Sequence, residues 1–260
     1  LHTLADMPLK GPFGKQMVAK ELGAWYGWGS SSKAGYYHRE GAYRRYLFLE
    51  ISGTRGGQSF VQPQGYHNIQ AFRRQIAVLA TLAKMTNRIL ILPQVLGDFH
   101  AQPLWIYLDL ESLEKNGIVY RETNFAYNKK SWYSHTQPFE SVTQMAIVES
   151  SNEIQLLTTA DGIITTAFSD RIPLSTFAPD DPLAAFFAVA SAHPDAKQSE
   201  ALFVNLAHFQ DGHGDLDEVH KLYSTLSWCQ WGMGPSTKNN EVSATHLSST
   251  GHCYGEGKAA

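Results

Sequence analysis

Residues 46–51 read YLFLEI, an almost continuous apolar run that is typical of a strand buried in a parallel sheet. A glycine-rich stretch follows, and then a helical pattern extends over residues 67–86, with ILILP at residues 89–93 as a second apolar run. Apolar residues of the helical pattern recur at three- and four-residue steps and therefore share one face: Ile69, Phe72, Ile76, Leu79 and Ala83. Strand, loop, helix and strand form a βαβ unit, so we expect residues 46–51 and 88–93 to be adjacent parallel strands with a right-handed crossover.

Later segments continue the alternation of short apolar runs and helical patterns. The sequence predicts strands at 117–120, 154–157, 163–167 and 201–206, helices at 183–192 after Pro182 and at 215–228, and either a helix or a strand at 142–148. Together these elements predict an α/β fold, a Rossmann-like three-layer domain with a mostly parallel sheet, over residues 46–230. We expect a loop-rich N-terminal segment at 1–45 and a flexible tail at 231–260.

Composition narrows the functional classes. The chain has 260 residues, of which 43% are hydrophobic and 17% charged, and this balance suits a globular core rather than wholesale disorder. A net charge of −3 and a pI of about 6.4 argue against a basic nucleic-acid footprint. No apolar run approaches the roughly 18 residues of a membrane span. The chain begins with Leu1, so we expect it to be a segment of a longer protein, attached to a membrane only through segments outside it.

The cysteine content is too low for a disulfide scaffold. The chain holds two cysteines, Cys229 and Cys253, which allow one bridge at most. Because Cys229 falls at the end of a predicted helix and Cys253 in the predicted tail, we expect no essential bridge.

The glycine-rich loop between the first strand and the long helix is the first candidate binding site. A loop that enters a helix N-terminus presents free N–H groups and the positive end of the helix dipole, which together suit a phosphate. The residues best placed for substrate binding are Arg55, Gly56, Gly57, His67, Asn68 and Arg73. The pattern is neither a dinucleotide fingerprint nor a Walker loop, so an ordinary connection between strand and helix is the competing interpretation.

Two acidic segments are candidates for metal binding. Asp109 and Glu111 follow an apolar run, and two carboxylates so placed could hold Mg²⁺ or Mn²⁺ against a diphosphate, although Asp109 could equally cap the next helix. Residues 208–220 are rich in histidine and aspartate and follow a predicted strand, but they match neither a zinc nor an EF-hand spacing. The alternative there is a polar loop in which Asp215 or Asp217 caps the last helix.

The stretch 65–93, GYHNIQAFRRQIAVLATLAKMTNRILILP, resembles the opening βαβ unit of fucosyltransferase-like proteins. It is more similar still to the C-terminal region of plant and algal arabinosyltransferases of the nucleotide-diphospho-sugar transferase type. Residues 118–125 (IVYRETNF) resemble that family's Arg-Glu-x-x-Phe, residues 204–206 a strand, and residues 219–229 a helix ending in Trp-Cys. The resemblance covers residues 46–230, and its most specific piece runs from Asn87-Arg88 to Pro93.

The resemblance implies a glycosyltransferase-related domain in the Golgi lumen that takes a nucleotide-sugar donor and a protein or polysaccharide acceptor. In that chemistry a base deprotonates the acceptor hydroxyl, while cationic and N–H groups stabilise the departing diphosphate; the sequence identifies no base. The alternative is a non-catalytic acceptor-binding or structural module beside a separate catalytic domain, since the family's donor-binding domain precedes this region. A third hypothesis, a metal-dependent hydrolase, would use Asp211, His213 and Asp217.

Overall fold

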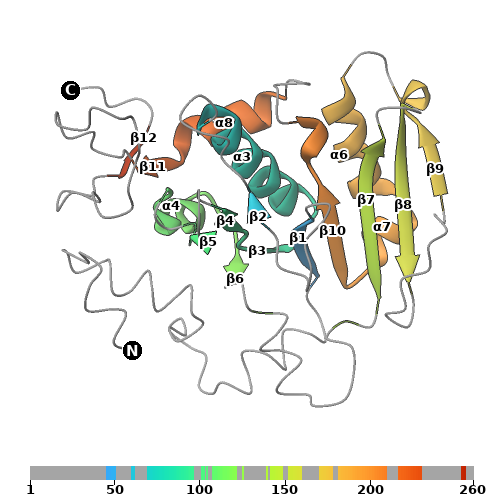
Figure 1. The fold of residues 1–260 in the computed structure, drawn as a ribbon, viewed down its shortest axis with the longest axis horizontal. Coiled ribbons are helices and arrows are strands. Elements are labelled where there is room, and N and C mark those ends of the chain that lie inside the picture. Colours follow the sequence, from blue (N-terminus) through green and yellow to red (C-terminus); the bar gives the residue numbers. More distant parts are fainter. Residues whose placement is uncertain are drawn as a thin grey trace.

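The structure is a computed structural model, and most of the predicted α/β region is described in it (Figure 1). The described residues are 45–50, 60–61, 69–96, 101–102, 104, 107–121, 125, 139, 141–148, 152–159, 170–177, 181–209, 216–229 and 253–255.

A seven-stranded sheet forms the centre of the molecule, in the spatial order β6-β3-β1-β10-β7-β8-β9. The five strands from β6 to β7 are parallel, and β8 and β9 extend the sheet in antiparallel pairing. The predicted α/β fold with a mostly parallel sheet is therefore confirmed. The strands are β1 (Tyr46–Glu50), β3 (Ile89–Ile91), β6 (Tyr120–Arg121), β7 (Val142–Val148), β8 (Glu153–Thr159), β9 (Asp170–Pro173) and β10 (Ala201–Asn205).

The βαβ unit has the predicted arrangement. Helix α3 (Ile69–Met85) joins β1 to β3, and these strands are parallel neighbours with Tyr46 opposite Ile89. The helix ends because Asn87 adopts a left-handed backbone conformation with a φ of 50°, one that asparagine tolerates better than most residues. The next amide, that of Arg88, then donates to the carbonyl of Ala83 at 2.8 Å, which satisfies one of the carbonyls left open at the helix end.

Helix α3 is buried on more sides than its amphipathic pattern predicts. Phe72, Ile76, Leu79 and Ala83 are all buried as expected, but so are residues on other sides of the helix, Gln75, Ala77, Val78, Ala80, Thr81 and Leu82 among them. The reason is that α3 packs against β1 and β3, against α6 (Pro182–Ala192) and against α8 (Asp217–Thr225), which lies beside it (Figure 1). It is the central helix of its layer.

The two faces of the sheet are covered differently. Leu47, Leu49 and Leu90 belong to one face and pack in the main core with residues of five helices: α3, α4 (Leu110–Lys115), α6, α7 (Pro194–Gln198) and α8. The alternate residues of the same strands, Tyr46, Phe48, Ile89 and Ile91, lie on the other face in a second cluster with Phe125 and Phe139. Alternation along each strand places both sets out of water, as expected for parallel strands covered on both sides.

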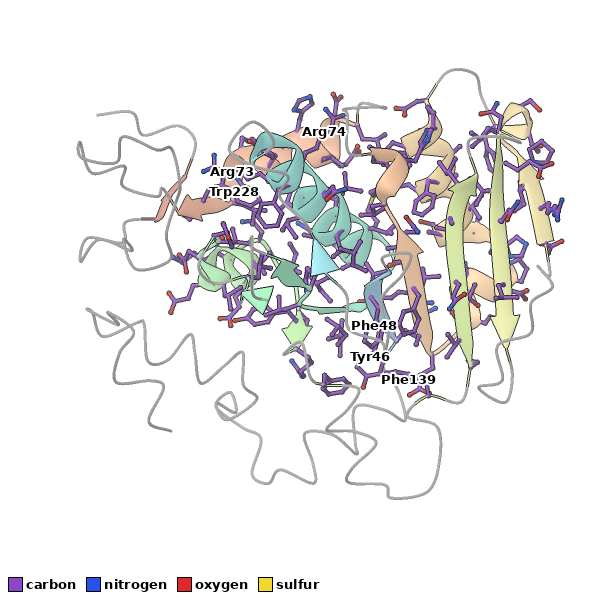
Figure 2. The ribbon with its side chains drawn as sticks, viewed as in Figure 1. Tyr46, Phe48, Arg73, Arg74, Phe139 and Trp228 are labelled. Carbon is purple, nitrogen blue, oxygen red and sulfur yellow. The ribbon has the colours of Figure 1, made fainter. Side chains whose placement is uncertain are left out.

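Right-handed crossovers explain where the second cluster comes from. If the connections that step across the sheet toward β6 carry their helices on one face, then the return from β6 to β7 must cross on the opposite face. Phe125 and Phe139 belong to that return segment. Their rings lie 4.9 and 5.5 Å from the ring of Tyr46, so over the described residues this return segment covers the second face of the sheet. Figure 2 shows Phe139 near Tyr46 and Phe48.

Several other predicted elements are confirmed, some with changed bounds. Helix α6 begins at Pro182 as expected, β10 ends one residue earlier than predicted, and residues 142–148 are a strand, β7. Strand β8 extends the predicted 154–157, and its hairpin partner is β9 at 170–173; the predicted strand at 163–167 lies outside the described residues.

The C-terminal helix is shorter than predicted. Helix α8 ends at Thr225, and the chain continues as β11 (Ser227–Cys229), so the prediction of one helix over 215–228 is wrong at its end. Leu226 turns the chain out of the helix by adopting an extended backbone conformation. The turn buries Leu226 and Trp228, neither of which exposes more than 1% of its surface. Burial of these two side chains against the core overrides the helical pattern.

Strand β11 pairs in antiparallel register with β12 (Cys253–Gly255), and this pairing sets Cys229 opposite Cys253. Our expectation about a bridge assumed that Cys229 ends a helix, and this placement is wrong. The expectation that no bridge is essential stays a prediction.

Three short strands form a separate small sheet in the order β2-β4-β5: β2 (Phe60–Val61), β4 (Gln94–Leu96) and β5 (Ala101–Gln102). Two 3₁₀ turns, η4 (Leu174–Thr176) and η5 (Ala207–Phe209), complete the described elements. The predicted N-terminal segment 1–45 lies outside the described residues except for Arg45, and so does the predicted tail except for β12. None of the described helices has the length and apolar character that crossing a bilayer requires.

Candidate functional site at the carboxyl edge of the sheet

The ends of β1 and β10 lie side by side, because these strands are parallel neighbours with Glu50 opposite Asn205. We call this region, together with the start of α3 and η5, the carboxyl edge. In α/β proteins, ligands bind outside the carboxyl ends of parallel strands, where the connecting segments leave the sheet. Both segments singled out in the sequence leave from here: the glycine-rich loop follows β1, and the histidine-rich segment follows β10.

The structure describes both ends of the glycine-rich loop. It leaves β1 at Glu50 and enters α3 at Ile69, so it opens at the carboxyl edge and leads into the N-terminus of a helix of 17 residues. Of the predicted binding residues, Arg55, Gly56, Gly57, His67 and Asn68 lie outside the described residues. The connection is not a plain loop throughout, since β2 within it pairs in parallel with β4, which follows β3.

Arg73, the remaining predicted binding residue, is half-buried on the N-terminal part of α3. Its guanidinium carbon lies 5.6 Å from the centroid of the Trp228 ring, a distance typical of a cation–π contact (Figure 2). Trp228 is itself fixed, because its indole Nε1 donates to the carbonyl of Tyr223 at 3.0 Å. The contact with Trp228 therefore gives Arg73 a packing role, and ligand binding by Arg73 stays a prediction.

A buried glutamine connects the two halves of the carboxyl edge. Gln75 on α3 exposes 7% of its surface, and its Nε2 donates to the carbonyl of Leu206 at 3.4 Å. Leu206 directly follows β10, and the half-buried His208 comes two residues later, with its ring edge-on to Phe209 at 5.4 Å. The start of the helix after β1 and the exit from β10 are therefore joined by a direct hydrogen bond.

Asp109 caps a helix. Its Oδ1 accepts a hydrogen bond from the amide of Glu111 at 3.0 Å, and Asp109 is the N-cap of α4. Of the two interpretations weighed for Asp109, the structure supports the cap. Among the described residues Asp109 and Glu111 do not converge with a third ligand. Binding of Mg²⁺ or Mn²⁺ at Asp109 stays a prediction.

The histidine-rich segment is described only from residue 216 onward, apart from its first two residues. Asp211, His213 and Asp215 lie outside the described residues, so the hydrolase hypothesis stays untested. The predicted cap by Asp217 is wrong, because Asp217 is already inside α8 and the N-cap position is Leu216, which makes no side-chain cap. Asp217 and Glu218 lie in the first turn, where their charges favour the helix dipole.

Arg88 belongs to the opposite edge of the sheet, where the parallel strands begin. We call the starts of β1, β3 and β10, together with α7, the amino edge. Arg88 is only 4% exposed, and its guanidinium donates to three main-chain carbonyls, that of Tyr46 in β1 at 3.0 Å and those of Ala196 and Ser199 in the α7 region at 2.5 and 3.0 Å.

Burial, and after it the charge of Arg45, lowers the pKa of Arg88 to about 9, so the guanidinium is still charged at neutral pH. Arg88 thus ties β1, β3, α7 and the approach to β10 together. The Asn87-Arg88 pair, the most specific piece of the family resemblance, has a structural role at this edge.

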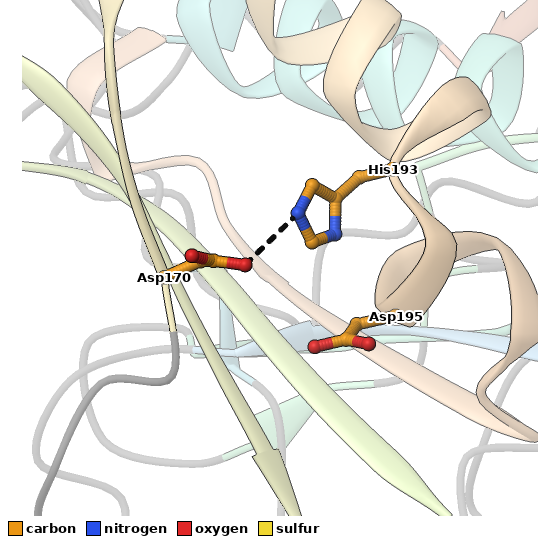
Figure 3. Close-up of side chains that lie close together, drawn as sticks. All are labelled: Asp170, His193 and Asp195. Atoms are coloured by element: carbon orange, nitrogen blue, oxygen red, sulfur yellow. Dashed lines mark ion pairs between the residues drawn. The ribbon is translucent and has the colours of Figure 1, made fainter.

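A cluster that the sequence did not indicate joins β9 to the α6–α7 corner. Nε2 of His193 lies 3.2 Å from Oδ2 of Asp170, and Asp195 completes a group whose potential ligand atoms all lie within 4.8 Å of one another (Figure 3). The sequence offers no signal for it, because Asp170 is distant along the chain and His193-Pro194-Asp195 matches no metal-binding spacing.

Comparison of the chain with protein-family models, with curated proteins and with solved structures finds no match in any of the three.

Proposed function

We propose that the protein is a glycosyltransferase-related domain that binds the diphosphate of a nucleotide-sugar at the carboxyl edge. One observation carries the proposal: the connection with Arg55, Gly56 and Gly57 opens beside the end of β10 and enters the N-terminus of α3. A helix of this length offers free N–H groups and a positive dipole end to an anion. The resemblance of residues 65–93 to nucleotide-sugar transferases supplies the ligand class.

The chemistry assigned to the site is stabilisation of negative charge on the diphosphate. N–H groups of the glycine-rich connection and the guanidinium of Arg55 would donate charge-assisted hydrogen bonds to phosphate oxygens, which gain charge as the sugar–phosphate bond breaks. His67 and Asn68, immediately before α3, would orient the ligand. No residue is assigned as the base that deprotonates the acceptor hydroxyl, and the proposal places no metal at Asp109.

The remaining parts of the proposal follow from the resemblance. The acceptor would be a protein or a polysaccharide, and the protein would act in the Golgi lumen.

Calorimetric titration of the chain with a panel of UDP- and GDP-sugars tests the proposal. We expect one member of the panel to bind, and Arg55→Ala to weaken its binding by about 1.5–3 kcal/mol through the loss of a charge-assisted contact. The matched control is Arg171→Ala, because Arg171 is an exposed arginine on β9, outside the carboxyl edge. Its removal should leave the affinity unchanged.

Two results would count against donor binding here. Either no sugar nucleotide binds to the wild-type chain, or Arg55→Ala and Arg171→Ala bind it equally well. In both cases the connection is an ordinary link between strand and helix, and the alternative of a non-catalytic acceptor-binding or structural module takes over. Titration with oligosaccharide acceptors would then be the direct measurement.

A further inference from the structure

We propose that Asp170, His193 and Asp195 bind one divalent transition-metal ion of the zinc class, which fastens the edge strand β9 to the corner between α6 and α7. The three residues come from three parts of the fold. Asp170 begins β9, His193 lies between the two helices, and Asp195 is in the first turn of α7. An imidazole with two carboxylates is a ligand set that zinc accepts.

The fold places the three side chains on the same side of the sheet. Asp170 pairs with Leu156 in the antiparallel ladder between β8 and β9, and residues directly opposite in such a ladder project to the same face. Leu156 belongs to the core that the helices cover. Asp170 is therefore a charged residue that projects toward the helix layer from the last strand of the sheet, and α6 and α7 are in that layer.

Local backbone constraints hold His193 and Asp195 in place. Pro194 separates them and is the first residue of α7, so its ring fixes the backbone between the two ligands. The backbone carbonyl of Asp195 accepts a hydrogen bond from Oγ1 of Thr143 at 3.2 Å, which ties this turn to β7. The site is thus built on restrained backbone on the helix side and on a paired strand on the other.

The distances suit a small cation after a modest closing movement. Zinc bound tetrahedrally at about 2.1 Å keeps its ligand atoms about 3.4 Å apart. The 3.2 Å between His193 Nε2 and Asp170 Oδ2 already matches this separation, and the other separations within the group are no more than 4.8 Å. Figure 3 shows the three side chains around a common space.

One further feature favours an ion over a simple pair between Asp170 and His193. Two carboxylates close together repel each other, and a bound cation removes that repulsion. The competing explanation is that Asp170 is an inward-pointing charge that protects an edge strand from pairing with another chain.

The purified chain, stripped with EDTA and dialysed, would be titrated with ZnCl₂ in a calorimeter and then melted with and without the metal. We expect one equivalent to bind and the melting temperature to rise by roughly 5 °C or more at a hundred-fold excess over the dissociation constant. Asp195→Asn and Asp170→Asn should each weaken this binding at least about ten-fold and remove the shift. Glu114→Gln on α4, an exposed carboxylate outside both the cluster and the histidine-rich segment, is the matched control and should bind like wild type.

The proposal is overturned if the wild-type chain binds no zinc, or if both aspartate variants bind it as tightly as the control does. The second result would place zinc elsewhere, for instance in the histidine-rich segment, and an additional Asp217→Asn variant would locate it there. Circular dichroism in EDTA shows whether each variant is folded. Because Asp170 is half exposed, at 53% of its side chain, its variant stays informative even if Asp195→Asn is unstable. Nucleotide-sugar binding is measured in a separate titration, so the outcome for zinc does not decide the proposed function, and the outcome for the sugar nucleotide does not decide the zinc site.

Discussion

The amino edge and the carboxyl edge of the sheet use arginine in opposite ways. At the amino edge, Arg88 is 4% exposed, and its guanidinium donates hydrogen bonds to main-chain carbonyls of β1 and of the α7 region. At the carboxyl edge, Arg73 is half-buried and lies over the ring of Trp228. The first guanidinium is fully engaged by the backbone, whereas the second keeps part of its surface in water, where a ligand could reach it.

This difference shows how a sequence motif should be weighed. The stretch 87–93 carries the most specific part of the family resemblance, yet it forms the turn and the buried arginine that hold the start of β3. A buried guanidinium that binds several carbonyls tolerates few replacements, so the residues that carry this resemblance have a structural role here. The ligand binding that we propose lies at the other edge, and the following predictions test this contrast between the two edges.

The largest expected effect is on stability, from the replacement Arg88→Met. Several buried carbonyls would lose charge-assisted hydrogen bonds worth about 1.5–3 kcal/mol each, partly offset by the removal of a buried charge, so we expect a loss of about 3–5 kcal/mol in the free energy of unfolding. Urea denaturation followed by circular dichroism measures it. Arg88→Lys keeps the charge but not the planar fork, and we expect it to recover only part of the loss.

The matched control for Arg88 is Lys84→Met, which removes an exposed charge from the last turn of α3 and should change the free energy of unfolding by no more than about 0.5 kcal/mol. A loss below 1 kcal/mol in Arg88→Met would show that the amino edge does not depend on this arginine. The contrast between the two edges would then fail.

An intermediate effect is expected at the carboxyl edge, from the contact between Arg73 and Trp228. Arg73→Ala should lower the free energy of unfolding by about 1–2 kcal/mol, since both the cation–π contact and the packing of its aliphatic stem are lost. A double-mutant cycle with Trp228→Leu should give a coupling energy of about 0.5–1 kcal/mol.

Arg74→Ala in the same cycle tests whether the coupling is specific, because Arg74 is the neighbouring arginine on α3. If the coupling energies of Trp228 with Arg73 and with Arg74 are equal, the contact between Arg73 and Trp228 is not specific. If Arg73→Ala also weakens sugar-nucleotide binding, Arg73 both packs and binds, and the prediction from the sequence holds for it.

The sequence predicts the framework well because the framework depends on local periodicity. The two strands and the helix of the βαβ unit follow from apolar runs and a 3.6-residue repeat, and Pro182 marks the start of α6. The end of α8 could not be read in the same way, because the turn at Leu226 depends on the burial of Leu226 and Trp228 in the core rather than on local propensity.

The two candidate sites differ in the same way, since one follows from local sequence patterns and the other depends on long-range packing. The carboxyl edge could be anticipated, since each segment there directly follows a recognisable strand. The cluster of Asp170, His193 and Asp195 could not, because it depends on the hairpin register that sets β9 beside the α6–α7 corner, and nothing in the spacing of these residues indicates proximity. Long-range register is the information that a single sequence lacks.

The smallest expected effect concerns Asp109 and separates a helix cap from a metal ligand. Asp109→Ala should cost about 1 kcal/mol in the free energy of unfolding, because the amide of Glu111 loses its acceptor at the start of α4. Asp109→Asn keeps an oxygen in the same place and gives up only the interaction of the charge with the helix dipole, so we expect a loss of about 0.5 kcal/mol or less.

A metal-binding role for Asp109 predicts a different result. If Asp109 held a divalent cation, the neutral asparagine would bind it much more weakly, and the Mn²⁺-dependent stabilisation of the wild type would disappear in Asp109→Asn. Thermal melts of both variants with and without MnCl₂ therefore decide between the two roles, and equal Mn²⁺ responses in wild type and Asp109→Asn are the outcome that the cap predicts.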